Sequence, residues 1–524
     1  MDSSGHTECL PNTRLDILKR ITDWITNPHN GQNILWLHGL AGSGKSTIAT
    51  SVANLFRDLN RLGAFVFFSR DVEKRSDPVT VIRTLAYQLG SFDPRLGTAI
   101  VASIEATPSI TQAPIASQFS KLLTGPLTSL DVLCSEGPIV LILDALDECG
   151  NARARRELIS VLSEELVKLP TFVRTIITSR AELDICHAFE HKENVCDIPL
   201  ETTSELTDND VMAYFRHHMA RIRAYNKVLP LTSDWPGPHK MRALGNRACG
   251  LFVWASTAIG WIDDGHDPEE RINMLLQLKV SSDAESALDI LYTKALQSAT
   301  LPDPTFISDF RAILGTIVSA KDPLTHFAID HLLALDERRP SLHTLSRLGC
   351  VLECRAGKPV RVLHPSFADF LSNPGRCKNE AWFIDLPYHN FILATQCLDR
   401  LNEALRQNLC DLTLSSTKVD YSIPEHISYA CIFWIDHVCM VNEELTITTI
   451  GHRVEKFISH HLLHWLEAMS ILKRSWTTTE LLTRIAKWIR VSPFAISLTI
   501  VSNANLISFN DRLSCLIKQA SPNW

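Results

Sequence analysis

The stretch ILWLHGLAGSGKSTIAT, residues 34–50, restricts the possible folds of this chain more than any other. An apolar run enters the pattern G-x-x-x-x-G-K-S at residues 39–46, and a segment compatible with a helix follows. A phosphate-binding loop needs this order of strand, glycine-rich turn and helix. Its glycines let several N–H groups converge on one anion, and the helix N-terminus adds a positive dipole end. The sequence therefore predicts a nucleotide site.

The loop predicts a role for individual residues. Lys45 is expected to reach the β- and γ-phosphates, and the Ser46 hydroxyl is expected to bind Mg²⁺. The predicted nucleotide-binding residues of the loop are Gly39, Leu40, Ala41, Gly42, Ser43, Gly44, Lys45, Ser46 and Thr47. Such a loop binds phosphates and not the base, so the expected ligand is ATP or ADP or, equally compatible with the loop, GTP.

Composition excludes several other classes of protein. The 524 residues carry a net charge of −7, and residues 283–372 show no dense basic cluster, which argues against nucleic acid as a partner. No apolar stretch is long and apolar enough for a membrane span, so no membrane is expected as a partner either. The 14 cysteines include no C-x-x-C pair, and we expect a reducing, cytoplasmic location.

Five short apolar runs alternate with helical stretches, which predicts an α/β fold with a parallel sheet. A helix over residues 10–30 is expected to precede them. The predicted strands are Ile34–His38, Ala64–Ser69, Ile139–Asp144, Arg174–Thr178 and Val195–Leu200. Beyond residue 203 the β signal fades, and helices are predicted at Asp208–Ala220 and Met241–Ile262. A hairpin follows, with strands Cys350–Cys354 and Val360–Leu363.

Acidic residues follow the predicted strand in PIVLILDALDE, residues 138–148. Asp144 stands at the end of the strand, where a carboxylate beside the phosphate loop can hold Mg²⁺ through water. Either Asp147 or Glu148 is expected to orient or deprotonate the attacking water. Arg180 ends the strand in TIITSR and is predicted to contact the γ-phosphate in the same crevice.

Several of these segments together resemble the NACHT-type NTPase domain of fungal NOD-like receptor proteins. The matching segments are ILWLHGLAGSGKSTIA, LGAFVFFSR, IVLILDALDECG, RTIITSR and CGLFVWASTAI, in this order. The first 200 residues also resemble the nephrocystin-3-like N-terminal nucleotide-binding module. These proteins are signal-transduction ATPases with numerous domains (STAND proteins). The resemblance implies a P-loop NTPase sheet of strand order 5-1-4-3-2, with TIITSR between the phosphate-loop and DALDE strands.

The resemblance also implies a domain order. It predicts an N-terminal lead-in (residues 1–32), a NACHT P-loop NTPase core (33–202), a helical domain (203–282), a winged-helix domain (283–373) and a C-terminal α-helical region (374–524). Relatives often continue into sensing repeats, so we expect a truncated or minimal member.

The resemblance further implies roles for single residues. Asp144 corresponds to the Mg²⁺ aspartate, Arg180 to the sensor arginine, and His364 to a histidine that contacts the β-phosphate of ADP. Thr13 and Arg14 fall where relatives place the segment that contacts the base. The family's helical-domain Gly-x-Pro is absent, which leaves the identity of the base open.

The expected function is a nucleotide-dependent signalling switch of the innate-immunity or incompatibility type, with slow NTPase activity. Self-association through the NACHT domain and unidentified protein partners are expected on activation. Two alternatives remain open: a nucleotide-binding scaffold that does not hydrolyse, and a P-loop small-molecule kinase.

Overall fold

The computed structural model describes residues 7–27, 31–225, 232–264, 267–281, 283–299, 304–355, 357–379, 381–409, 423–441 and 444–491. The predicted lead-in extends outside these ranges at residues 1–6 and 28–30, and the predicted C-terminal region does so at residues 380, 410–422, 442–443 and 492–524. The chain divides into two compact units. The first comprises Met1–Ala295 with His364–Ser366, and the second comprises Leu296–Leu363 with Phe367–Trp524.

The first unit contains a five-stranded parallel sheet with the strand order β2-β3-β4-β1-β5. This order confirms the predicted P-loop NTPase sheet. All five predicted strands form, with ends shifted by at most a few residues. The strands are β1 (Ile34–His38), β2 (Leu62–Phe67), β3 (Ile139–Asp144), β4 (Val173–Ser179) and β5 (Val195–Pro199).

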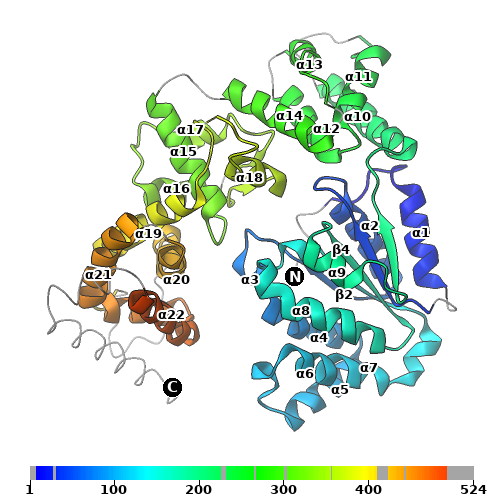
Figure 1. The fold of residues 1–524 in the computed structure, drawn as a ribbon, viewed down its shortest axis with the longest axis horizontal. Helices are drawn as coiled ribbons and strands as arrows, with labels where there is room; N and C mark the ends of the chain where they lie inside the picture. Colours follow the sequence, from blue (N-terminus) through cyan, green and yellow to red (C-terminus); the bar gives the residue numbers. More distant parts are fainter. Residues whose placement is uncertain are drawn as a thin grey trace. The chain divides into compact units, whose positions relative to one another are not determined.

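Helices cover both faces of the sheet (Figure 1). Apolar residues of α1 and α2 pack on one face, and apolar residues of α4–α9 pack on the other, so the central strands β1, β3 and β4 are buried from both sides. The helices are α1 (Leu15–Thr26), α2 (Lys45–Asp58), α3 (Glu73–Ser76), α4 (Val81–Phe92), α5 (Pro94–Ala106), α6 (Ile115–Phe119), α7 (Gly125–Thr128), α8 (Ala152–Glu165) and α9 (Leu183–Phe189). Helix α1 is shorter than the predicted 10–30, because Asn12 and Arg14 have positive φ and form a turn before it.

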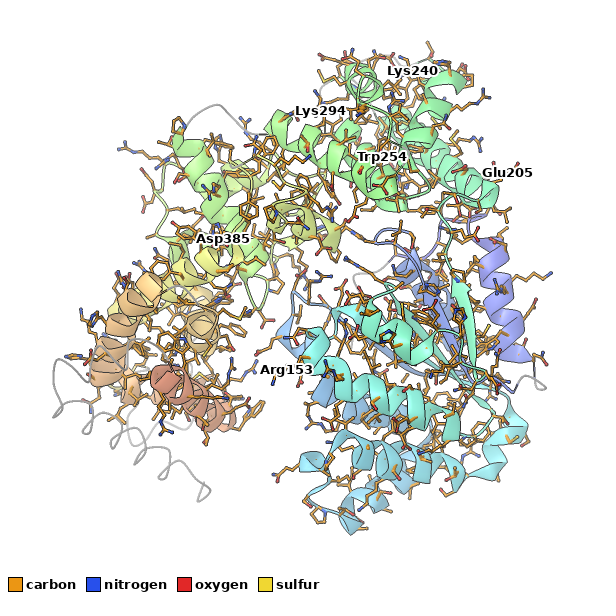
Figure 2. The ribbon with its side chains drawn as sticks, viewed as in Figure 1. Arg153, Glu205, Lys240, Trp254, Lys294 and Asp385 are labelled. Atoms are coloured by element: carbon orange, nitrogen blue, oxygen red, sulfur yellow. The ribbon has the colours of Figure 1, made fainter. Side chains whose placement is uncertain are left out.

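Five further helices begin in the first unit after the sheet: α10 (Glu205–Tyr225), α11 (Pro238–Ala248), α12 (Phe252–Asp263), α13 (Pro268–Leu276) and α14 (Ala284–Ala299). The single helix predicted over Met241–Ile262 is wrong, because Cys249 and Gly250 both have positive φ and separate α11 from α12. A Cβ on Gly250 would lie 1.9 Å from the carbonyl oxygen of Thr202, so only glycine fits there. Trp254 of α12, labelled in Figure 2, donates to the carbonyl of Ala287 at 3.2 Å.

The second unit is mostly helical. Its helices are α15 (Pro304–Ser319), α16 (His326–Leu333), α17 (Ser341–Leu345), α18 (Pro365–Ser372), α19 (Leu386–Ala404), α20 (Glu425–Cys439), α21 (Glu444–Ile471) and α22 (Thr478–Val491). The predicted hairpin forms as β6 (Leu352–Glu353) and β7 (Arg361–Val362), paired antiparallel between α17 and α18. No helix in the described ranges has both the length and the apolar character of a membrane span.

Candidate functional site

The phosphate loop connects the end of β1 to the first turn of α2. Gly42 and Gly44 have φ values of 77° and 96°, conformations that residues with side chains rarely adopt. Helix α2 begins at Lys45 without a side-chain cap. Its first N–H groups therefore remain available to an anion, and the positive end of the helix dipole lies at the same place.

The ammonium group of Lys45 lies within the loop. Its Nζ donates hydrogen bonds of 2.9 Å to the carbonyls of Gly39 and Leu40. Removal from water lowers the pKa of Lys45 to about 8, against an opposing effect of the Asp147 carboxylate. Lys45 is thus a cation in contact with the loop backbone, where phosphates are expected to bind.

The carboxylate of Asp144 is fully buried at the end of β3, and Thr178 of β4 orients it. The Thr178 hydroxyl accepts a hydrogen bond of 2.9 Å from the N–H of Ala145 and donates one to Oδ1 of Asp144. Thr178 was not among the predicted site residues. It stands two residues before Arg180 in TIITSR, but only the pairing of β3 with β4 reveals its role.

Asp147 and Glu148 lie in a single 3-10 turn, Leu146–Glu148, but their surroundings differ. Asp147 is buried, and both of its oxygens bind Arg180: Oδ1 accepts from the backbone N–H at 3.0 Å, and Oδ2 pairs with Nε at 3.2 Å. Oε2 of Glu148 faces the N–H of Arg70 at 3.4 Å. Removal from water raises the pKa of Glu148 to about 7, against the weaker opposing effect of Arg70. A pKa near neutral pH suits a general base, which makes Glu148 a candidate for that role.

A buried arginine that the sequence did not reveal supports this turn. The side chain of Arg155, on α8, donates to the carbonyl of Asp147 at 2.7 Å. It also donates to both oxygens of Asp184 at 2.9 Å and forms an ion pair with Glu182. Arg155 therefore joins the acidic turn after β3 to the segment after β4. Its position in a helix rich in charge gave no signal of this role.

The N-terminal segment also reaches the loop. Arg14 Nη2 donates to the carbonyl of Ser43 at 2.8 Å, whereas the hydroxyl of Thr13 donates to Leu10 at 2.7 Å within its own turn. Ser46 and Thr47 are half-buried in the first turn of α2. The residues from Gly39 to Thr47 thus form one loop and helix start, with Arg14 bound to its backbone.

Helix α12 touches the outside of the loop, a contact that sequence analysis missed. The N–H of Val253 lies 3.2 Å from the carbonyl of Gly42. A Cβ on Gly42 would lie 2.0 Å from Cγ1 of Val253. Gly42 is therefore required both by its backbone conformation and by the close approach of α12.

His364 precedes α18, and its described hydrogen bonds are local. Its Nδ1 lies 2.7 Å from the hydroxyl of Ser366 and 3.2 Å from the Ser366 backbone nitrogen. The Ser366 hydroxyl is in turn 2.8 Å from the hydroxyl of Tyr292. These bonds position the ring at the start of the helix, and none of them is to a residue of the phosphate loop. A contact between His364 and ADP stays a prediction.

The oxygen donors of this site suit Mg²⁺ that is bound jointly by protein, phosphate and water. They do not form a complete set of protein ligands for a metal ion. In the described ranges, no three His, Cys, Asp or Glu side chains are grouped to hold a metal ion. Mg²⁺ is commonly bound by one or two protein oxygens together with phosphate and water. A hydroxyl from Ser46 and the oriented carboxylate of Asp144 match that donor set.

Comparisons with known proteins identify one matching family and one similar protein over most of this chain. Residues 13–180 match the family described as Nephrocystin 3, N-terminal. The chain is 24% identical over 450 residues to the vegetative incompatibility protein HET-E-1 of Podospora anserina. That match covers 78% of this chain and 31% of HET-E-1, so this chain spans about a third of its relative's length.

Two solved structures are similar at low identity. The STAND protein with a tetratricopeptide repeat sensor from Pyrococcus horikoshii is 12% identical, with a TM-score of 0.43 over 99% of this chain and 59% of that one. Cdc6p from Pyrobaculum aerophilum is 12% identical, with a TM-score of 0.32 over 75% of this chain and 96% of that one. Scores of this size carry no inference about function. The family match and the HET-E-1 relative confirm the resemblance expected from the sequence: this chain is similar to fungal NACHT-type STAND P-loop NTPases, with a nephrocystin-3-like nucleotide-binding module at residues 13–180.

Proposed function

We propose that this protein is a nucleotide-dependent signalling switch that binds ATP and ADP with Mg²⁺ and hydrolyses ATP slowly. One observation carries the proposal. Lys45, Asp144 and the pair of Asp147 with Arg180 lie at the carboxyl ends of three adjacent parallel strands, β1, β3 and β4. Ligands of open α/β sheets bind at this edge.

In this proposal, the N–H groups of the loop and Lys45 hold the phosphates, while Ser46 and Asp144 hold Mg²⁺. When bound, Mg²⁺ would supply positive charge to the phosphate oxygens, where negative charge develops during hydrolysis. Glu148 accepts a proton from the attacking water because its raised pKa lies near neutral pH. Arg180, which is bound to Asp147 in this structure, is the residue that we assign to sensing the γ-phosphate.

The switch itself rests on the resemblance to STAND proteins. We assign residues 283–373 to a winged-helix domain that closes on bound ADP through His364, and we expect self-association when ATP replaces ADP. ATP can shift this equilibrium only through its higher affinity for the open state. The similarity to the vegetative incompatibility protein HET-E-1 supports an incompatibility role.

The pH dependence of hydrolysis follows from the two shifted groups. Glu148 must lose its proton, so kcat/KM should rise as the pH increases through about 7. Lys45 must keep its proton, so kcat/KM should fall as the pH passes about 8. Since kcat/KM reports groups of the free enzyme, we expect a narrow optimum between these values. The profile is measured from initial rates of hydrolysis at pH values on both sides of this optimum, for the wild type and for Glu148→Gln. A profile with no acidic limb, or one whose acidic limb persists in Glu148→Gln, would contradict the role of Glu148.

Turnover by the purified chain alone separates this function from its alternatives. A switch should bind ATP and ADP and release phosphate slowly, at well under one turnover per second, without any acceptor. A small-molecule kinase would show turnover only after an acceptor is added, and a scaffold would bind nucleotide without turnover. Identification of the nucleotide released on denaturing the purified protein settles ATP against GTP. Absence of binding to any nucleotide would contradict the proposal.

A further inference from the structure

Arg14 is a buried cation bound to three separate parts of the first unit. Arg14 is 5% exposed, although it belongs to the N-terminal segment before α1. Nη2 donates to the Ser43 carbonyl at 2.8 Å, and Nη1 donates to the Thr207 hydroxyl of α10 at 3.0 Å. The guanidinium carbon lies 5.0 Å from the ring centre of Phe252, at the start of α12.

Arg14 is bound to α10 through both its main chain and its side chain. The backbone N–H of Arg14 donates to the Asp210 carboxylate at 3.1 Å, in addition to the bond from Nη1 to Thr207. Burial lowers the pKa of Arg14, with Asp210 opposing that effect. A buried charge is costly unless it is hydrogen-bonded and held near a compensating charge. The fold therefore maintains a costly cation beside the backbone of the phosphate loop.

The bond to Ser43 has a geometric consequence for the next residue. A trans peptide is planar, and its C=O and N–H point in opposite directions. The carbonyl of Ser43 points toward Arg14, so the N–H of Gly44 points away from it. Gly44, with φ of 96°, is the residue directly before α2, where the anion is expected.

We propose that Arg14 is a positioning residue that binds the Ser43 carbonyl and thereby directs the Gly44 N–H toward a nucleotide phosphate. This inference rests on the proposed function, because it requires a phosphate at the loop. It also departs from the role that the family resemblance implies for this residue. Both Nη atoms bind protein groups, on the loop and on α10, and the Nε is buried without a hydrogen-bond partner among the described residues.

The two roles predict different ligand dependence. A residue that contacts the base affects the affinities for ATP and GTP differently. It has no effect on the affinity for a ligand without a base. A residue that orients the loop affects every ligand with the same phosphates. We therefore expect Arg14→Gln to lower the affinities for ATP, GTP and inorganic tripolyphosphate alike, by about 10- to 100-fold. This is the range for the loss of one hydrogen bond to a charged group, here from the Gly44 N–H to a phosphate. Calorimetry or competition with a fluorescent nucleotide, each with Mg²⁺, measures the three affinities.

Matched variants separate positioning from loss of fold. Arg20→Gln makes the same change at an exposed site on α1 and should leave all three affinities unchanged. Thr207→Val removes the hydroxyl that accepts from Nη1 but keeps the bond to Ser43, so it should lower the three affinities only about threefold. Arg14→Lys retains the charge and most of the stem, and should recover part of the lost affinity. Thermal unfolding of each variant establishes that it is folded at the assay temperature.

The outcomes distinguish this inference from the proposed function. If the wild-type chain binds none of the three ligands, the proposed function fails. If it binds them and folded Arg14→Gln or Arg14→Lys binds equally well, the positioning role fails. If the Arg14 variants lose the preference between ATP and GTP while tripolyphosphate affinity is unchanged, Arg14 contacts the base and the inference is overturned.

Discussion

Lys45→Met lowers the affinity for ATP by at least about 100-fold, because it removes the cation that is expected to contact two phosphates. A hydrogen bond to a charged group contributes about 1.5–3 kcal/mol, so the loss of two corresponds to a factor of 100 or more. Methionine keeps the length of the side chain. Titration with a fluorescent ATP analogue measures the change. Lys19→Met, at an exposed position on α1, is the matched control.

The same substitution should not destabilise the protein, which separates lost binding from lost fold. The pKa of Lys45 falls from 10.5 to about 8 on folding, so the folded chain disfavours the charged form. Between these two pH values the unfolded chain holds more protons, and the free energy of unfolding therefore rises with pH. Lys45→Met should lack this rise and be at least as stable as wild type near pH 7. Wild-type affinity in the variant would remove Lys45 from the site.

Glu148→Gln slows hydrolysis by about 100-fold or more while ATP affinity is retained. Glutamine keeps the shape of the side chain but cannot accept the proton, and a positioned general base contributes about 10²–10⁴-fold. Single-turnover rates and equilibrium binding measure the two quantities separately. Glu157→Gln, at an exposed position on α8, is the control and should leave both unchanged.

Asp147→Asn tests the alternative assignment of the base. Both oxygens of Asp147 bind Arg180, so this change should disturb Arg180 and leave the proton acceptor in place. Its effect on hydrolysis should therefore be smaller than that of Glu148→Gln. If Asp147→Asn abolishes turnover and Glu148→Gln does not, Asp147 is the base. If the double variant turns over at the wild-type rate, neither acid takes part.

Local patterns in the sequence were sufficient for the sheet and the phosphate loop. Strand runs alternating with helices, together with the G-x-x-x-x-G-K-S pattern, predicted five strands and the placement of Lys45 and Asp144 at one edge. The strand order came from the family resemblance, and the structure confirms it. These features depend on short segments, where side-chain periodicity and turn residues carry the signal.

The residues that hold the site in place could not be predicted, because their roles arise from contacts between segments that are far apart in the sequence. Arg155 joins two loops, Thr178 binds across neighbouring strands, and Val253 approaches Gly42 from a helix more than 200 residues further along the chain. No periodicity or motif encodes such pairs. The break between α11 and α12 was missed because the residue pair that breaks the helix includes a cysteine, Cys249, with positive φ.

The contact between Gly42 and Val253 also limits how relatives of this protein can exchange parts. The loop and α12 lie so close together that there is no room for a Cβ on Gly42, and a backbone hydrogen bond joins them. A chimera that took the sheet from one homologue and α10–α14 from another would have to preserve both surfaces together. In recombination between homologues, the sheet and these helices therefore have to be exchanged together as one unit.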